Sequence, residues 1–503
     1  MNYYLGVDIG TTSSKAVAFS ASGEILSQYS VGYEMLHPQT GWCEQSPDEI
    51  LRAVIDVINR VQVELAPAQP LLISFSAAMH SLLLVNKNGD PVTNSIIWAD
   101  SRAVEIAAEL RNSSRGPAFY RVSGVPVQAM SPLCKLLWFK KNSAYEFELA
   151  YKFIGIKEYI FSRIFGEYAV DTAIAAATGL LNLETLQWDE NILAFAGLEK
   201  SKLSEVVNVK KIFYYNSEKL HPSVGNLALP EKTVFVIGGS DGALANIGTG
   251  AVDKHSMVIT IGTSSAARII TDKPGTDPSM RTFCYHAKDN SYIIGGASNN
   301  GAVVLQWLAE TLLQTHESLP TLFKLAKNIP AGSDGLLFLP YILGERAPIW
   351  NSYAKGNFFG VTINHTKAHL VRSVMEGVIY SVYSIGKILM EKNPSIEIFA
   401  TGGFANSPLW LQILADVCNC RVLVSGSVES SAMGAVVVGL ESLNLPALPA
   451  NKILSVHEPD AACHETYQVQ FRKFERIYEL LKEEFKNDVL PVVKDVPVSV
   501  VVL

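Results

Sequence analysis

Short apolar runs that end in small or acidic residues recur along the chain. One such pattern spans residues 3–19, where two apolar runs flank Gly10-Thr11-Thr12-Ser13; it predicts a buried strand, a tight turn and a second strand. Residues 71–76 and 234–237 are further apolar runs, and segments with helical spacing lie after them or between them, for example 47–65. Strands that alternate with helices predict an α/β fold.

The strand-turn-strand pattern is repeated in the second half of the chain. Residues 255–270 run from a strand through Gly262-Thr263-Ser264-Ser265 to a basic residue and a second strand, and Gly262 lies 252 positions after Gly10 in a chain of 503 residues. A repeat at half of the length predicts two similar domains, 1–247 and 248–503, with a nucleotide clamped between them. Thr260 takes the place of Asp8 in the second half, so only the first half would supply a carboxylate for a metal ion.

The first turn has the chemistry of a phosphate site. The backbone amides and hydroxyls of Thr11, Thr12 and Ser13 can donate to phosphoryl oxygens, and Lys15 adds positive charge. Asp8 could hold a Mg²⁺ ion or its water shell beside them. An ordinary hairpin with a solvated Asp8 is the alternative.

Composition narrows the classes of function. The chain has 48% hydrophobic and 18% charged residues and a net charge of −7 without a basic stripe, which argues against nucleic acid as a partner. Its six cysteines lack metal-binding spacing and fit the reduced thiols of a cytoplasm. No apolar run is long enough to span a membrane, and Met1 leads directly into a predicted strand, so we expect neither a membrane segment nor a signal peptide. The apolar tail, 489–503, could either dock as a strand or fray.

Polar and aromatic side chains follow the predicted strands of the first half, where ligands of α/β proteins bind. The candidates for contacts with a polyol are Met79, His80, Trp98, Asp100 and Arg102. Trp98 could cover carbon atoms, Asp100 could accept from hydroxyls, and Arg102 could pair with a substrate carboxylate. A loop histidine without a ligand, and an Asp100–Arg102 ion pair that caps the next helix, are the alternatives.

Two more acids stand beside small residues. Asp171 precedes an alanine-rich segment, 173–177, that would let a ligand approach closely, so it is another candidate for the substrate. Asp241 follows a strand and Gly238-Gly239, and a carboxylate presented in this way suits the base that takes a proton from an alcohol during phosphoryl transfer. An N-capping role for Asp241 is the alternative.

The second half offers contacts for a nucleoside. Gly402-Gly403 could let a flat base lie against bare backbone, and Asn406 offers both a donor and an acceptor to adenine. Gly301 precedes a predicted helix, 303–313, whose N-terminus would be open to an anion or a ribose. A plain strand-to-helix turn at 402–406 is the alternative.

These motifs resemble the FGGY family of carbohydrate kinases over about residues 3–486. Two family signatures are matched, one at 130–142 with Lys135 and Trp138, and one at 356–376. The resemblance implies two actin-like (ribonuclease H-like) ATPase domains with a central cleft that close over ATP and a sugar, with Asp241 as the catalytic base and Mg²⁺ near Asp8 and Asp241. It also implies nucleotide contacts from Thr11, Thr12, Ser13, Lys15, Gly262, Thr263, Gly301, Gln306, Gly402, Gly403 and Asn406.

Within the family, several motifs are most similar to the subgroup that phosphorylates gluconate: 78–81, 98–102, 155–159, 175–179 and 344–348. The resemblance therefore predicts ATP-dependent phosphorylation of D-gluconate to 6-phospho-D-gluconate by a cytoplasmic enzyme. Xylulose kinases usually carry Gln-Met-His-Gly where this chain has Ala78-Met79-His80-Ser81, and xylulose or another sugar or polyol is the alternative. A nucleotide switch or sugar sensor without kinase activity is the alternative from another class. The expected partners are a small sugar acid and ATP, neither nucleic acid nor membrane, and a homodimer is one option for the assembly.

Overall fold

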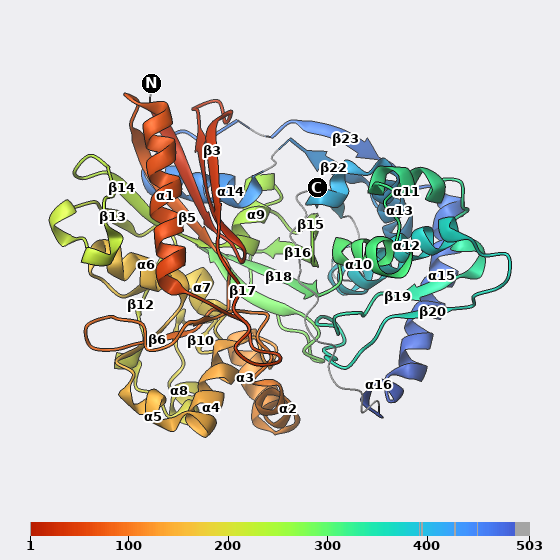
Figure 1. The fold of residues 1–503 in the computed structure, drawn as a ribbon, viewed down its shortest axis with the longest axis horizontal. Helices are drawn as coiled ribbons and strands as arrows, with labels where there is room; N and C mark the ends of the chain where they lie inside the picture. The colour runs from red at the N-terminus through yellow and green to blue at the C-terminus, as the bar shows by residue number, and fades with distance from the viewer. Residues whose placement is uncertain (1, 392, 394–395, 427–428, 450, 488–503) are drawn as a thin grey trace.

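Two mixed β-sheets, one from each half of the chain, form the framework of the computed structural model (Figure 1). The structure describes residues 2–391, 393, 396–426, 429–449 and 451–487. The apolar tail, 489–503, lies outside the described residues. Within them, no helix combines the length and the apolar character that crossing a membrane requires.

The first sheet has the strand order β13-β14-β5-β1-β2-β3. β1 pairs antiparallel with β2 and parallel with β5, and β14 pairs parallel with β5 on its other side. The predicted strand, turn and strand at the beginning of the chain are thus confirmed. The bounds are β1 Tyr3–Ile9, β2 Ser13–Phe19, β3 Ile25–Gly32, β5 Pro70–Ala77, β13 Ile212–Tyr214 and β14 Val234–Ser240.

The second sheet repeats this topology. Its order is β17-β18-β16-β15-β21-β22-β23; β15 pairs antiparallel with β16 and parallel with β21, and β22 continues parallel to β21. The second half thus reproduces the arrangement of β3, β2, β1, β5 and β14, which confirms the two-domain actin-like fold. The bounds are β15 Ser256–Ile261, β16 Ser265–Thr271, β17 Phe283–Lys288, β18 Ser291–Ser298, β21 Glu397–Thr401, β22 Val422–Ser425 and β23 Ile453–His457.

Amphipathic helices cover the sheets. In α1 (Pro47–Leu65), the Glu49 amide donates to the Ser46 side chain and Pro47 occupies the first turn, which fixes the helix start as the sequence predicts. The apolar face of α1 is buried in the same core as β1 and β5. In the second half, α12 (Lys367–Met390) is largely buried and packs with α13 (Pro408–Cys418) and α15 (Ala461–Leu481).

Helix α14 (Ser430–Ser442) comes from the second half of the sequence but packs on the first sheet. A Cβ atom at Gly6 of β1 would lie 2.3 Å from the Ala432 carbonyl oxygen, and one at Gly434 would lie 1.9 Å from the Leu244 carbonyl oxygen of α9 (Asp241–Thr249). Glycine is therefore needed at both positions for these elements to touch. The two halves are joined through α9 and α14.

One local prediction differs from the structure. The predicted helix 303–313 is α10 (Ala302–Trp307), continued by a π-helical turn, Leu308–Leu312, rather than one α-helix. A short strand, β20 (Asn357–Phe359), begins the second family signature and pairs with β19 (Leu337–Leu339). The remaining elements are β4 Glu44–Gln45, β6 Leu83–Val85, β7 Ser95–Ile96, α2 Val104–Asn112, α3 Arg115–Ser123, α4 Pro132–Asn142, α5 Ala144–Leu149, β8 Lys152–Ile154, α6 Ile156–Phe165, β9 Ala169–Asp171, α7 Thr172–Ala176, β10 Leu181–Asn182, β11 Gln187–Trp188, α8 Glu190–Ala196, β12 Glu205–Val207, α11 Leu319–Ala326 and α16 Glu484–Asn487.

Candidate active site

Asp8 and Asp241 lie at the same edge of the first sheet. Asp8 is near the end of β1 and stands opposite Ser76 of β5, while Gly239 of β14 stands opposite Ser76 from the other side. Asp241 follows the end of β14 directly, as the first residue of α9. The carboxyl ends of three neighbouring parallel strands therefore bring the two carboxylates together, where ligands of such sheets bind.

The two carboxylates influence each other. Burial raises the pKa of Asp8 to about 6, and the charge of Asp241 raises it further. Burial also raises the pKa of Asp241, against the opposing charge of Arg268. One oxygen of Asp8, Oδ1, is buried and has no hydrogen-bond partner among the described residues.

This pair of acids fits a divalent cation. Mg²⁺ in phosphotransfer sites is commonly held by one or two carboxylates together with water and substrate phosphates, and the orphaned Oδ1 of Asp8 is a free ligand atom. Among the described residues, no group of three or more His, Cys, Asp or Glu side chains is placed to hold a metal ion. A site built by Asp8 and Asp241 would therefore depend on oxygens from the substrate.

The first turn is held from several sides. The Gly10 amide donates to the Ser13 carbonyl at 3.0 Å, which closes the turn, and Trp98 Nε1 donates to Thr11 Oγ1 at 2.8 Å. Thr12 is exposed. Lys15, predicted to face phosphates, pairs with Glu429 at 2.8 Å. A phosphate at this turn would compete with Glu429 for the Lys15 ammonium.

The structure gathers most of the predicted nucleotide residues of the second half around the second turn. The Ala302 amide donates to the Gly262 carbonyl at 2.7 Å, and the Gly301 amide donates to the Thr263 carbonyl at 3.1 Å. A Cβ at Gly301 would lie 2.5 Å from the Gly262 carbonyl oxygen, and one at Gly402, whose φ is +92°, would lie 2.5 Å from the Ile261 carbonyl oxygen. Glycine thus lets three segments meet there.

Three other predicted nucleotide residues make none of these contacts. Gly403 begins a short 3₁₀ turn, and Asn406 ends it and is exposed. Gln306 donates to Glu310 at 3.1 Å, one turn along the same helical segment. A role for these three residues in nucleotide binding remains a prediction.

The predicted sugar residues Met79 and Trp98 line a small pocket beside the first turn. The other lining residues are Gly10, Thr11, Gln45, Ile50, Ala78, Ser81, Ser95, Ile97 and Ile156. His80 is buried next to it, and its Nδ1 lies 2.9 Å from the Ala177 carbonyl oxygen. Because a carbonyl only accepts, Nδ1 carries the proton. Burial, and then the charge of Lys135, lower the pKa of His80 to about 3, so the ring is neutral.

Arg102 and Asp100 form an ion pair, as the alternative interpretation of these residues expects. Arg102 Nη2 lies 2.8 Å from Asp100 Oδ2 and 2.6 Å from Glu44 Oε1, and the Arg102 side chain is only 3% exposed. Its guanidinium also stacks on Trp42, 3.7 Å from the ring centre. These contacts occupy the Arg102 side chain, so the structure favours a structural role over the predicted pairing with a substrate carboxylate.

Asp171 is likewise engaged inside the protein. It caps α7 by accepting from the amides of Ala173 and Ile174, and it pairs with Lys157 at 2.5 Å; neither Asp171 nor Lys157 is more than 3% exposed. Lys157 Nζ also donates to the Ile237 and Gly239 carbonyls at 3.1 Å. The pair therefore holds the end of β14 that presents the next acid, Asp241, and the structure favours this role over the predicted sugar contact.

A second buried lysine, Lys135, ties two loops of the site together. Its Nζ donates to the carbonyls of His80 at 2.6 Å, Ile97 at 2.8 Å and Ile96 at 3.0 Å. The sequence analysis named Lys135 only as part of a family signature and gave it no role in the site. The sequence does contain one sign of this role, because Lys135 lies on the apolar side of its helix, three positions before Trp138.

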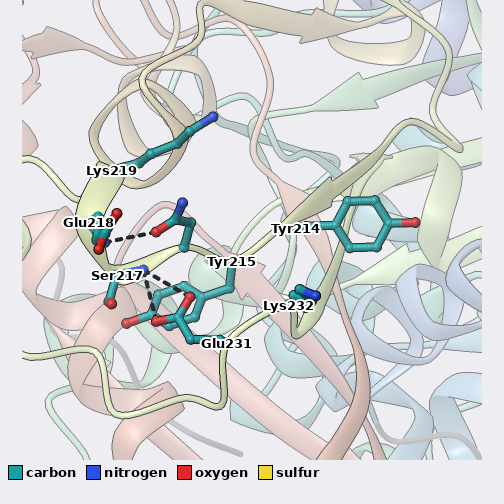
Figure 2. Close-up of a pocket in the computed structure, with 8 residues that line it drawn as sticks. Tyr214, Tyr215, Ser217, Glu218, Lys219, Glu231 and Lys232 are labelled. Atoms are coloured by element: carbon teal, nitrogen blue, oxygen red, sulfur yellow. Dashed lines mark hydrogen bonds between the residues drawn. The ribbon is translucent and has the colours of Figure 1, made fainter.

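A larger hollow, of about 550 Å³, lies at the hairpin between β13 and β14 (Figure 2). Glu231 accepts from the Ser217 amide there, and Tyr214 points away from this contact. The hollow is at the beginning of β14 whereas Asp241 follows its end, and seven residues of strand span about 20 Å. The hollow is therefore separate from the two acids.

The chain belongs to the FGGY family of carbohydrate kinases. The N-terminal domain model of that family matches residues 3–248 and its C-terminal domain model matches residues 257–442. The chain is thus a sugar kinase by its fold and family, and the family implies ATP as the phosphoryl donor.

Three relatives show which kinases of this family the chain resembles in sequence and in structure. The chain is 43% identical to a gluconokinase from Bacillus licheniformis over 450 residues, which covers 87% of each protein. The crystal structure of a gluconate kinase from Lactobacillus acidophilus superposes with a TM-score of 0.92 at 34% identity, covering 97% of this chain and 99% of that one. A ligand-bound xylulose kinase structure from the same organism also has a TM-score of 0.92 at 34% identity, covering 97% of this chain and all of that one.

Proposed function

We propose that this protein transfers the γ-phosphoryl group of ATP to D-gluconate and forms 6-phospho-D-gluconate. The observation that carries the proposal is the 43% identity to a gluconokinase over 87% of the chain. The site agrees with it, since Asp241 stands at a sheet edge beside a small pocket that Met79 and Trp98 line. The motif Ala78-Met79-His80-Ser81 also differs from the Gln-Met-His-Gly usual in xylulose kinases.

Asp241 acts as the general base. Its carboxylate takes the proton of the terminal hydroxyl while that oxygen forms a bond to the γ-phosphorus and the bond to the bridging oxygen of ADP breaks. Burial raises the pKa of Asp241, which makes its carboxylate a better proton acceptor at neutral pH. The ion pair of Lys157 and Asp171 fixes the strand end from which Asp241 projects.

Asp8 and Asp241 would hold Mg²⁺, which supplies positive charge to the β- and γ-phosphates. Thr11, Thr12 and Ser13 then donate to phosphoryl oxygens from the first turn. The nucleotide side is formed by Gly262, Thr263, Gly301, Gln306, Gly402, Gly403 and Asn406. Closure of the two halves would exclude water, which would otherwise compete with the sugar for the phosphoryl group.

The location, the domain boundary and the assembly are proposed from the sequence. We expect a cytoplasmic protein whose two domains meet after residue 247, and a homodimer is one option for its assembly. Xylulose is the alternative substrate, because a solved xylulose kinase is as similar in fold and identity as the solved gluconate kinase.

A coupled assay of ADP release over gluconate, xylulose, ribulose and glycerol tests the substrate. Turnover with xylulose and none with gluconate would overturn the assignment. Asp241→Asn should abolish transfer to gluconate and leave ATP binding, measured by calorimetry, within about threefold of the wild type. Asp56→Asn, at an exposed position of α1, is the matched control and should leave both unchanged. An active Asp241→Asn enzyme would remove Asp241 from the role of base.

A further inference from the structure

Two arginines from the second half lie beside residues that line the pocket of the first half, and the sequence analysis assigned neither to the substrate. Arg268 is on β16, five residues after Thr263 of the second turn. Its Nε would lie 3.2 Å from a Cβ atom at Gly242, the residue after Asp241. The Met79 methyl group would lie 3.5 Å from the same point. The Arg268 guanidinium therefore lies beside both the base and the lining of the pocket.

Arg346 lies against another residue of the pocket lining, Trp98. Its guanidinium carbon lies 4.7 Å from the centre of the Trp98 ring, and its Nη2 donates to the Ser298 carbonyl at 3.0 Å. Its Nε is buried and has no acceptor among the described residues. Burial lowers the pKa of Arg346 to about 10, so it stays charged at neutral pH. A buried N–H without an acceptor is costly unless a ligand supplies one.

Neither arginine is neutralised in the way that Arg102 is. Among the residues that the structure describes, no carboxylate forms an ion pair within 4.0 Å of Arg268 or of Arg346, and the one side-chain contact of Arg268 is a long one, 3.4 Å from Nη1 to Thr260 Oγ1. At longer range, the charge of Asp241 acts on Arg268, and the charges of Glu345 and Arg268 act on Arg346. Arg346 in turn acts on His80. Because the His80 ring is neutral, it does not cancel the positive charge of the two arginines.

We propose that Arg268 and Arg346 bind the carboxylate of the sugar acid and select an aldonic acid over a neutral polyol. This inference rests on the proposed function. Guanidinium groups present forked donors that match a carboxylate, and the buried Nε of Arg346 still needs an acceptor. Sites with buried donors discriminate strongly against a substrate that cannot pair with them. Both arginines come from the second half whereas Met79 and Trp98 come from the first, so the substrate would join the two halves.

The test is kcat/KM for gluconate and for D-glucitol, a neutral six-carbon acceptor, in the wild type and in Arg268→Met and Arg346→Met. Loss of a charged hydrogen bond typically costs about 1.5–3 kcal/mol, so each variant should lose about 10- to 100-fold with gluconate. Activity with glucitol should fall less than threefold, and so should the affinity for ATP. Arg268→Lys and Arg346→Lys keep the charge and should lose less, which separates recognition from misfolding.

Arg102→Gln is the matched control, because this arginine is already paired with Asp100 and Glu44. It should lower the melting temperature and keep the gluconate-to-glucitol ratio within threefold of the wild type. An unchanged ratio in both arginine-to-methionine variants would overturn the inference while the proposed function stands. Equal losses with both acceptors would assign Arg268 to the phosphoryl group and would also overturn it. A wild type inactive on gluconate would instead show that the proposed function is wrong, and the inference would fall with it.

Discussion

Replacing Asp171 with Asn separates two roles for this acid, a sugar contact and a structural partner of Lys157. The substitution removes the negative charge of a buried pair whose atoms lie 2.5 Å apart. It keeps the cap of α7, because Asn is as good an N-cap as Asp. Any loss of stability therefore reports the ion pair rather than the helix start.

The expected loss is large. Removing one partner of a buried salt bridge typically costs about 3–5 kcal/mol, because the other charge stays buried without compensation. Lys157 keeps the carbonyls of Ile237 and Gly239 as acceptors at 3.1 Å, which places the expected cost near the lower end, about 3 kcal/mol. Since both carbonyls belong to the end of β14, kcat should also fall as Asp241 loses its fixed position.

Urea unfolding of Asp171→Asn, Lys157→Met and the double variant measures this cost. The double variant should recover at least half of the stability lost in Asp171→Asn, because it removes both charges. The KM for gluconate should change less than threefold in all three proteins. An Asp171→Asn enzyme as stable as the wild type to within about 1 kcal/mol, with a tenfold higher KM for gluconate, would refute this reasoning and make Asp171 a sugar contact.

Two further predictions concern the loops of the pocket. Lys135→Met removes three hydrogen bonds to buried carbonyls, at about 1 kcal/mol each, although the Ile96 and Ile97 carbonyls keep the Leu82 and Asp100 amides as donors. The variant should raise the KM for gluconate and not that for ATP. Lys141→Met, exposed on the same helix, should do neither, and equal effects of the two substitutions would speak against loop positioning. The pKa of His80 is about 3 in the folded protein and 6.5 when unfolded, so the unfolded chain binds more protons between these values and stability is lost as the pH falls below about 6.5. The loss should reach about 2 kcal/mol at pH 5 by urea unfolding, and an equally steep decline in His80→Gln would contradict this origin.

The framework of the fold could be predicted because its signals are local. Each phosphate turn, such as Gly10-Thr11-Thr12-Ser13, lies between two strands that are contiguous in sequence, and the repeat at Gly262 shows the duplication without any tertiary information. Asp241 follows a strand and two glycines, so its place at a sheet edge could also be derived from neighbouring residues. These predictions needed only the rule that ligands bind where parallel strands end.

The partners of charged residues could not be predicted in the same way. Arg102 and Glu44 are far apart in sequence, and nothing near Arg102 distinguishes a paired guanidinium from a free one; only the fold brings Glu44 to 2.6 Å. The same holds for Lys157, whose acceptors Ile237 and Gly239 belong to a strand much later in the chain. Residue type indicated that charge was present, whereas tertiary packing decided whether it was available to a ligand.

The contacts between the two halves explain why the framework could be predicted from the sequence and the partners of charged residues could not. The first half supplies the acids Asp8 and Asp241, and the second half supplies Arg268 and Arg346, so the proposed site needs charged groups from both halves. Helix α14 packs on the first sheet and fixes how the halves meet, through backbone contacts that only glycine permits at Gly434. In the function proposed here, the base and the metal carboxylate come from one half, whereas recognition of an anionic sugar would depend on the arrangement of both halves.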